Sequence, residues 1–569
     1  MSKPSEWRSQ GGVLLILCLF GLFVYANSLR NPFIWDDSYL ITQNHFVRSF
    51  GNLPEVFKHH LYYSTAGLSN FYRPLQTTFL MLDYALWGFE PFGYHLTSLI
   101  FHILCAFAAF GVVALLFQRR WVAFLVALLF LVHPINSTVV DYVSSRADSQ
   151  ATLFMLCSLG FFFQSGTAVK RRLLWYGGSL LCFAFALLSK EMAVSLPLLI
   201  FSAALFLDRK RVGKVIPFSI LLGIYVCLRL TILNFSEPNL ENFPSLEVRL
   251  LTTVESFVRL AGSLFVPLEV HMEKNLPLST GFLQSSTLLS LLIWAAVGVG
   301  MAWVRRRSRI CFFGLLWFFI TLLPMANIVP INATIADHWL YLPCIGFFMA
   351  LIGGLADWIQ TLKPTLQPRW VWASIGFYAA SVFIYSGLTV RQNTVWNDPI
   401  RFFELVLRYS PDSSRAHNEL GAIYLDRQQV DTAISHFQLA IQIDPQFDQP
   451  YHNLAVAYSQ KGGFQQAIVL CQRALRLSPN NPRTYNNLGN LYCQLKQFDG
   501  AIEAYQTALR LNPDYEVVYN NLGTVYFQMG QFEKAETMWK QALQIDPQFQ
   551  MVLDNLCLLK QRREHQAGS

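Results

Sequence analysis

Two adjacent carboxylates, Asp36 and Asp37, follow the first apolar run of the chain and stand among aromatic residues such as Trp35. Partial burial next to a membrane raises the pKa of a carboxyl group, and repulsion within a pair raises one of the two further. A carboxylate tuned in this way can act as a general base on a hydroxyl acceptor. An Asp–Asp pair in a loop is more often a turn or a helix cap, so a catalytic interpretation needs support from the rest of the chain.

Other common catalytic and cofactor patterns are missing from the sequence. The histidines are scattered without zinc-type spacing, and neither a Walker A motif nor a GxGxxG turn between a strand and a helix occurs. A divalent ion at Asp36 and Asp37 is conceivable, but we predict no metal site and no fixed cofactor. The 10 cysteines form no CxxC pair and lie mostly in apolar runs, as small buried hydrophobic residues do.

The composition places these residues in a membrane protein. Of the 569 residues 53% are hydrophobic and only 14% are charged, against about 25% charged in an average globular protein. The net charge of +8 lies largely in short clusters such as Arg305–Arg307. Because no broad basic face forms, we expect no nucleic-acid partner.

Up to about residue 390 the chain is a series of apolar runs, and we predict eleven membrane spans there, the first of them a retained anchor and not a removed signal peptide. The spans are 11–29, 95–117, 119–135, 149–166, 173–189, 191–207, 215–234, 286–304, 311–329, 339–356 and 370–390. The mixed segment 250–270 reads as a re-entrant or interfacial helix. Basic loops in the cytoplasm then place the N-terminus inside, and the long loop 30–94 and everything after 391 outside.

The C-terminal part carries an internal repeat. Prolines recur every 34 residues, at 411, 445, 479, 513 and 547, with Leu-Gly/Ala, Tyr and two Ala in phase between them. This is the tetratricopeptide (TPR) signature. We predict a junction over 391–413, four repeats over 414–548 and a capping helix and tail over 549–569, so that the whole chain is all-α.

Asn453, Asn487 and Asn521 occupy one equivalent position on the first helix of three repeats; the first repeat has Glu419 there. That helix lines the concave groove of TPR solenoids, and an amide can hydrogen-bond a peptide backbone whatever its side chains. A similar asparagine ladder binds polypeptide in the nucleocytoplasmic O-GlcNAc transferase. The alternative interpretation is that Asn only suits a solvated helix face or fills the repeat consensus.

The order of the motifs resembles the transmembrane and TPR-containing O-mannosyltransferase family and, more distantly, the protein O-mannosyltransferases, all of the C-type glycosyltransferase fold. The resemblance covers nearly the whole chain and rests on Trp35-Asp36-Asp37, Phe71-Tyr72-Arg73-Pro74-Leu75, His95-Leu96, Leu131-Val132-His133-Pro134, Ser145-Arg146-Ala147-Asp148, Leu188-Ser189-Lys190-Glu191 and Asp337-His338-Trp339-Leu340-Tyr341-Leu342-Pro343.

The resemblance implies transfer of a sugar, mannose or another hexose, from a polyprenyl-phosphate donor to a hydroxyl acceptor, with inversion at the anomeric carbon. The acceptor would be Ser or Thr of a polypeptide on the non-cytoplasmic side, bound by the TPR groove. The first-loop aspartate is the base in the protein O-mannosyltransferases and matches Asp36 or Asp37. We favour Asp36, although Asp-Asp stands here where those enzymes have Asp-Glu.

A leaving phosphate needs cations. Arg73, Arg146 and Lys190 lie at predicted outer membrane boundaries, and Arg229 lies inside an apolar span, where it either contacts the donor or reaches the headgroups. The acceptor-orienting candidates are the remaining polar residues of the motifs, either as substrate contacts or as ordinary helix-end and ion-pair partners: His133, Asp148, Glu191, His338 and Tyr341.

Two other classes of function fit parts of the sequence. A membrane-anchored TPR scaffold for envelope or secretory complexes would need no charged motifs at the outer boundary. A transporter would show an internal repeat among its spans, and none is evident. Short loops favour a bacterial inner membrane with a periplasmic array; in a eukaryote the array would be in the lumen of the endoplasmic reticulum.

Overall fold

The structure is a computed structural model that describes residues 4–63, 69–166, 171–235, 243–268, 274, 276–331 and 334–567. Within these ranges the chain is all-helical, as predicted, and no strand occurs. It divides into two compact units, Met1–Leu405 and Val406–Ser569. Each unit is described by itself.

Every apolar run predicted as a span is a helix in the first unit. The helices are α1 Pro4–Tyr25, α4 Pro91–Phe117, α5 Arg120–Val132, α7 Arg146–Gln164, α8 Arg172–Ser189, α9 Leu196–Leu207, α10 Ile216–Leu230, α12 Ser285–Val304, α13 Arg309–Leu322, α14 Pro343–Thr361 and α15 Gln367–Trp396. The mixed segment forms α11, Leu246–Ser263.

Six helices in the described part of the chain are long and apolar enough to cross a membrane: α4, α8, α10 with the turn before it, α12, α14 and α15. A seventh is possible if α5 and the following segment Pro134–Asp141, bent by 59°, form one span. The segments Gly11–Tyr25, Glu191–Leu207 and Arg309–Met325 are apolar but shorter. The count of eleven spans therefore stays a prediction, and α11 is not among the candidates.

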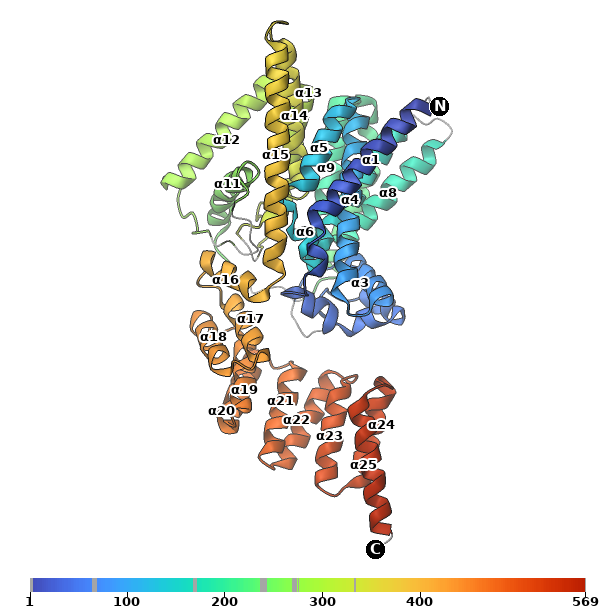
Figure 1. Cartoon of the computed structure of the whole chain (residues 1–569), viewed down its shortest axis with the longest axis vertical. Coiled ribbons are helices and arrows are strands. Elements are labelled where there is room, and N and C mark those ends of the chain that lie inside the picture. The colour runs from blue at the N-terminus through green and yellow to red at the C-terminus, as the bar shows by residue number, and fades with distance from the viewer. Residues whose placement is uncertain are drawn as a thin grey trace. The chain divides into compact units, whose positions relative to one another are not determined.

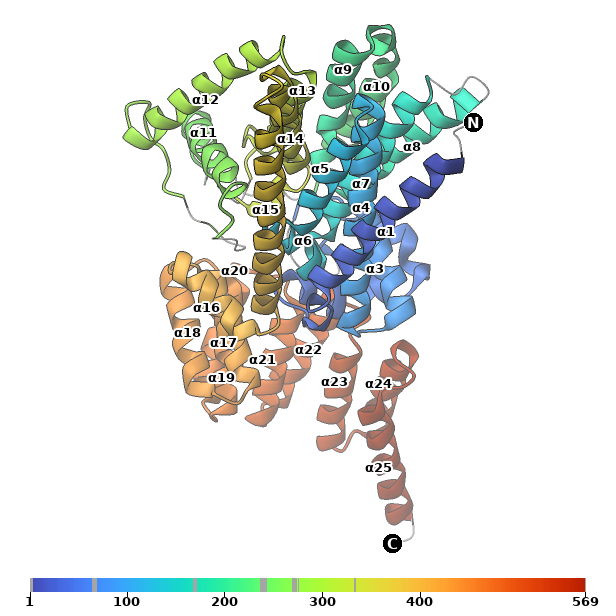
Figure 2. The ribbon, with the colours of Figure 1, turned by 45° about the horizontal axis from the view of Figure 1, so that its top comes forward.

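One buried hydrophobic core is shared by the helices α4, α5, α7 and α14 (Figure 1). Helices α1 and α15 pack against this core. Helices α13 and α14 cross where Gly314 meets Gly346, and a Cβ atom on either glycine would lie 2.5–2.6 Å from backbone of the other helix. By contrast, α12 packs on α11 and α13 at one side of the bundle (Figure 2), with only 11% of its span buried, as expected of a lipid-facing helix.

The predicted outer loop 30–94 is largely folded. It contains the short helix α2, Leu53–Val56, and α3, Pro74–Trp87, which the sequence analysis did not anticipate. Pro74 occupies the first turn of α3, where its missing N–H costs nothing. Leu80 and Met81 of α3 then close a small core with Leu40, Ile41 and Val143, so α3 is fixed by tertiary packing.

After α16, Pro399–Tyr409, the second unit consists of four antiparallel helix pairs and a last helix: α17 Ser414–Asp426, α18 Val430–Ile443, α19 Asp448–Gln460, α20 Phe464–Leu477, α21 Pro482–Gln494, α22 Phe498–Leu511, α23 Glu516–Gln528, α24 Phe532–Ile545 and α25 Gln550–Ala567. These are the predicted TPR repeats and the helix that follows them.

In each repeat, the size of the Gly or Ala residue on the first helix is complementary to the size of the side chain opposite it on the second helix. A Cβ atom on Gly421, Gly489 or Gly523 would lie 2.5–2.7 Å from the aromatic ring of Phe437, Tyr505 or Trp539. The second repeat has Ala455 instead of glycine, and the equivalent partner there is the small Cys471 in the same cluster. The pairing explains why glycine stands opposite an aromatic ring in three repeats and alanine stands opposite the smaller cysteine in the other.

Candidate active site

The first loop presents its two carboxylates very differently. Asp37 is 0% exposed and accepts hydrogen bonds from Ser144 N (2.7 Å), Ser144 Oγ (2.6 Å) and Val143 N (3.3 Å). Asp36 is half-buried, and its backbone N–H donates to the hydroxyl of Tyr142 at 3.2 Å. Asp37 thus anchors the loop, and Asp36 is the more exposed of the two carboxylates.

Burial raises the pKa of Asp37 to about 7, although the hydrogen bonds from Ser144 and Val143 oppose the rise. A pKa near 7 suits a general base, but a base must first reach the proton that it removes. Exposure therefore favours Asp36 as the general base. The titration of Asp37 affects the stability of the folded protein instead.

We expect the free energy of unfolding to fall as the pH rises from about 4 to about 7, because the folded carboxyl of Asp37 keeps its proton up to a pKa of about 7 and the unfolded one loses it near 3.8. The loss is at most about 4 kcal/mol. Thermal unfolding in detergent at three pH values measures it. Asp37→Asn should flatten the slope relative to the wild type, and an unchanged slope would contradict this assignment.

Five of the predicted site residues gather where α3 and α7 begin and α8 ends. Arg73 Nε and Nη2 donate to Glu191 (2.8–3.2 Å), and Lys190 Nζ donates to Asp148 Oδ2 at 2.6 Å. The fifth is half-buried His338, whose pKa is lowered to about 4 by burial and by the nearby charges of Lys190 and Arg73. We call these five residues the charged cluster.

The charged cluster retains unused hydrogen-bond donors. Arg73 uses Nε and Nη2 for Glu191, and within the described residues its Nη1 makes no hydrogen bond. The ammonium group of Lys190 has three N–H donors, of which one is directed at Asp148. His338 is neutral above pH 4 or so and offers a ring N–H. Such a set of donors fits an anionic oxygen, while Glu191 and Asp148 hold the cations in place.

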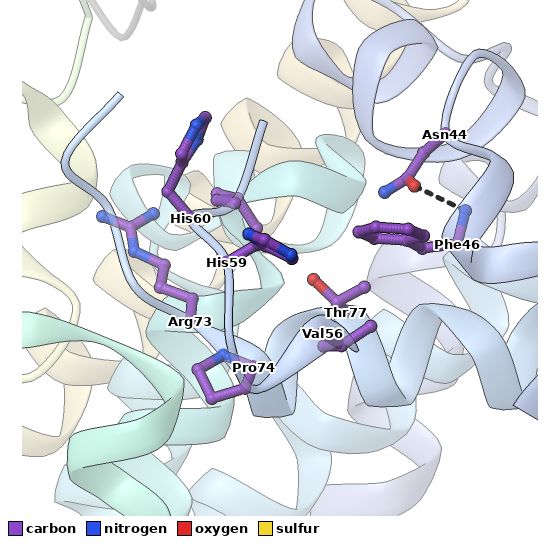
Figure 3. Close-up of a pocket in the computed structure, with 9 residues that line it drawn as sticks. Asn44, Phe46, Val56, His59, His60, Arg73, Pro74 and Thr77 are labelled. Atoms are coloured by element: carbon purple, nitrogen blue, oxygen red, sulfur yellow. Dashed lines mark hydrogen bonds between the residues drawn. The ribbon is translucent and has the colours of Figure 1, made fainter. Parts of the chain in front are cut away.

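A small pocket adjoins the charged cluster through Arg73 (Figure 3). Its wall includes Phe46, His59 and Thr77, which point toward one another, while Arg73 and His60 lie to one side. The ring of His59 also stacks on Tyr63, with centroids 3.7 Å apart. An aromatic face, a hydroxyl and imidazoles beside a guanidinium are suitable partners for a polar, hydroxyl-rich ligand.

The segment 141–148 connects the first loop to the charged cluster. Asp141 Oδ1 accepts from Asn31 Nδ2 (3.1 Å), and Tyr142 and Ser144 hold Asp36 and Asp37. The carbonyl of Ser144 accepts from Gln76 Nε2 of α3 (2.7 Å), three residues after Arg73. The segment ends at Asp148, the partner of Lys190, so one stretch of chain fixes both parts of the site.

Arg146 is not part of the charged cluster. Its side chain is 1% exposed, its Nη1 pairs with Asp83, its Nε donates to Ser98 Oγ (2.9 Å) and its Nη2 donates to the carbonyl of Tyr94 (2.6 Å). Every nitrogen of the guanidinium is used inside the protein. Three of its five N–H donors are used in these bonds, and the 1% exposure of the side chain keeps the other two away from a phosphate at the surface.

Arg229 lies in the last turn of α10. Its guanidinium donates to Asn70 Oδ1 at 2.9 Å and to the carbonyls of Asn70 and Leu233. It also lies over the rings of Tyr72 and Phe235, 5.7–5.8 Å from their centroids. Tyr72 precedes Arg73, so Arg229 borders the site, and among the described residues it pairs with no carboxylate.

His133 and Tyr341 lie in the protein core. His133 is 0% exposed; its Nε2 faces the carbonyl of Leu264 (3.2 Å) and its Nδ1 accepts from Ile135 N (3.3 Å). The hydroxyl of Tyr341, also 0% exposed, is 2.7 Å from His102 Nδ1. Both are partners of helix ends and core groups, the ordinary role that the sequence analysis set against substrate contact.

The three TPR asparagines form bonds between repeats. Asn453 Nδ2 donates to Asn418 Oδ1 (2.9 Å), Asn521 Nδ2 donates to Asn486 Oδ1 (3.0 Å), and Asn487 Nδ2 is 3.1 Å from His452 Nε2. Each bond reaches the preceding repeat, and Asn555 of α25 continues the series. The amides therefore have a structural task, and peptide binding by their remaining groups stays a prediction.

The sequence analysis missed the residues that support the site, above all Asn31, Gln76, Asp83, Tyr142 and Ser144. None lies in an obvious catalytic pattern. The one available signal was the position of Asp83, a carboxylate in an otherwise apolar helical segment, which in a buried setting demands a cationic partner.

Curated proteins with similar sequences are named protein O-mannosyl-transferases. TMTC2 of Homo sapiens is 32% identical over 194 residues, which are 32% of this chain and 22% of that protein. TMTC3 of Homo sapiens is 23% identical over 463 residues, 72% of this chain and 49% of that protein, and Tmtc3 of Drosophila melanogaster is 23% identical over 493 residues, 72% of this chain and 52% of that protein. The chain is a relative of the TPR-containing O-mannosyltransferases. It spans about half or less of the length of these relatives.

The repeats of this O-mannosyltransferase relative match family models of their own. The model described as TPR repeat matches residues 421–462 and 489–530, and models described as tetratricopeptide repeat match 448–481, 470–503 and 517–549. Among solved structures, MamA is 28% identical with a TM-score of 0.24, covering 26% of this chain and 86% of that chain. YrrB is 19% identical with a TM-score of 0.25, covering 27% and 80%. The predicted TPR repeats are confirmed.

Proposed function

We propose that the protein transfers mannose, or another hexose, from a polyprenyl-phosphate donor to a Ser or Thr hydroxyl of a polypeptide. The observation that carries the proposal is the charged cluster, which offers several cationic and neutral N–H donors beside a pocket and is tied by residues 141–148 to an accessible carboxylate, Asp36. The names of the relatives support the same class of activity.

Asp36 is the general base of this proposal. It removes the proton of the acceptor hydroxyl while the oxygen attacks the anomeric carbon. The C–O bond to the donor phosphate breaks on the opposite face, so the transfer inverts the configuration. Asp37 takes no part in the proton transfer, because it is buried and bonded to Ser144.

The leaving polyprenyl phosphate gains a negative charge as its bond to the sugar breaks. Donors that are already oriented stabilise such a charge without reorganising during the reaction. Arg73 Nη1, the remaining ammonium donors of Lys190 and the ring of His338 would supply them, with Arg229 at the border.

The active site would face the non-cytoplasmic side of the membrane, and the repeats would bind protein. Polyprenyl-phosphate sugars would be used on the non-cytoplasmic face, which is the periplasmic face of a bacterial inner membrane or the lumenal face of the endoplasmic reticulum. The TPR unit would bind the acceptor polypeptide or a partner protein. Reporter fusions after residue 391 test the side directly.

The decisive test compares Arg73→Gln with the double variant Arg73→Gln/Glu191→Gln, assayed with lipid-linked mannose and a Ser/Thr peptide. We expect both variants to raise the KM for the donor by about 10-fold to 100-fold, the value of a lost charged hydrogen bond. The double variant leaves no unpaired carboxylate, so recovery of KM would mean that Arg73 serves only to pair with Glu191.

Arg259→Gln is the matched control, because this arginine also pairs with a carboxylate of the same unit, Glu255, but lies on α11 and is 54% exposed. The variant should keep a donor KM within about 2-fold of the wild type, since Arg259 belongs neither to the charged cluster nor to the pocket. A wild-type protein that transfers no sugar at all would instead favour the non-enzymatic TPR scaffold.

A further inference from the structure

Five buried aromatic residues form a chain of ring contacts that runs from Trp35 to the partner of the Asp36 backbone N–H. They come from three distant parts of the chain, and their exposed fractions are at most 6%: Trp35, Tyr142, Trp396, Phe402 and Phe403. We call them the aromatic cage. The site described above uses none of them as a substrate contact.

The contacts of the cage close on themselves. Trp35 stacks on Phe403, with centroids 5.3 Å apart and an angle of 21°, and meets Phe402 edge-on at 5.9 Å. Phe402 packs on Trp396 at 4.5 Å, and Trp396 stacks on Tyr142 at 5.6 Å. The hydroxyl of Tyr142 then accepts the hydrogen bond from the backbone N–H of Asp36 at 3.2 Å, the residue that follows Trp35.

The backbone of Trp35 needs such support. Its φ is +61°, in the left-handed region, which a bulky residue other than glycine rarely adopts. Strained conformations of this kind persist only where surrounding contacts enforce them, and they cluster at functional sites. Stacking of the indole on Phe403 supplies the contact, and the strained torsion sets the direction in which the next residue leaves the turn.

Helix α15, which carries Trp396 of the cage, is also hydrogen-bonded to the chain just before the first loop. Asn393 of α15 donates to the carbonyl of Val24 in α1 at 3.0 Å, and Asn27 donates to the carbonyl of Val390 at 2.9 Å. Trp396 ends α15, and Phe402 and Phe403 lie on α16. The helix that ends at Trp396 is therefore fixed to the helix that precedes the loop carrying Asp36.

We propose that the aromatic cage is the positioning device of Asp36, with Phe403 and Tyr142 as positioning residues. The inference rests on the proposed function, in which Asp36 is the base. The cage fixes the torsion angles before Asp36 and its N–H, and so aims the carboxylate at the acceptor hydroxyl. The catalytic unit then requires residues through Leu405, beyond the end at 390 that the apolar runs predicted.

The test uses the full chain with Phe403→Ala, Phe403→Tyr and Tyr142→Phe. We expect Phe403→Ala to lower kcat by about 10-fold to 100-fold with the KM for the donor unchanged, since a misplaced base affects the chemical step and not donor binding. Phe403→Tyr keeps the stacking face and should retain at least half of kcat. Tyr142→Phe keeps the stack on Trp396 but loses the acceptor for the Asp36 N–H, and should lower kcat several-fold.

Phe218→Ala is the matched control, because Phe218 is a 0% exposed phenylalanine of the same unit that packs on Phe162 and Phe183. It should lower the melting temperature as Phe403→Ala does, with kcat of the folded fraction preserved. Equal losses of kcat in both variants, or a rise of KM without a fall of kcat in Phe403→Ala, would overturn the inference.

Asp36→Asn separates this inference from the proposed function. If Asp36→Asn keeps full activity, Asp36 is not the general base, and the mechanism given under the proposed function is wrong. If Asp36→Asn is inactive and Phe403→Ala is as active as the wild type, the base stands and the cage has no positioning role.

Discussion

Replacing Asp36 by Asn is expected to lower kcat by about 10²-fold to 10⁴-fold, the contribution of a well-placed general base. Asparagine keeps the backbone N–H that donates to the hydroxyl of Tyr142 and has nearly the size of aspartate, so we expect the variant to fold. The KM for the lipid-linked donor should change little, since the charged cluster is intact. Single-turnover transfer to a Ser/Thr peptide measures the effect on the chemical step.

Asp37→Asn is the control for Asp36→Asn, because it alters the neighbouring carboxyl and leaves the accessible one. Asp37 accepts three hydrogen bonds from Val143 and Ser144, so its loss should lower the melting temperature while the folded fraction keeps kcat within about 10-fold. A variant Asp37→Asn that is stable but as inactive as Asp36→Asn would make Asp37 the base.

Arg146→Met is expected to destabilise the membrane unit by about 3–5 kcal/mol, because removal of one partner leaves the other charge buried and unpaired. Asp83, its partner, has a side chain that is 1% exposed. Thermal unfolding in lipid nanodiscs checks the prediction. Activity measured on the remaining folded protein at low temperature should show a normal KM for the donor.

The double variant Arg146→Met/Asp83→Leu distinguishes a structural pair from a phosphate contact. Apolar residues of similar volume often replace a buried ion pair without loss, so we expect most of the stability to return. A double variant that is stable yet has a donor KM raised by 10-fold or more would show that Arg146 contacts the donor after all.

Sequence patterns predicted the helices of this protein well, because the pattern of apolar and small residues in a helix depends on residues that are close in sequence. All eleven apolar runs are helices, and the 34-residue period gave the repeats in register. The pairing of Gly421 with Phe437, and of Ala455 with the smaller Cys471, shows why the small residues recur. By contrast, α3 was missed, since its stability depends on a small core shared with Leu40 and Val143.

The candidate site was predicted in kind but not in detail. The five residues of the charged cluster come together as neighbours: Arg73, Lys190, Asp148, Glu191 and His338. Arg146 carries the same charge and a similar predicted depth, yet its partner is Asp83 on α3. Sequence spacing cannot separate a cation that contacts substrate from one that is consumed by a buried carboxylate, because both occur at helix ends near the membrane.

The sequence by itself determined which segments are helical, where the repeats begin and that an acid pair follows the first apolar run, because hydrophobic periodicity and residue spacing are properties of neighbouring residues. Only the tertiary structure decided which acid is accessible, which cations are already paired and which rings hold Trp35. Those outcomes depend on residues hundreds of positions apart, such as Trp35 and Phe403, whose meeting is fixed by the packing of the whole unit.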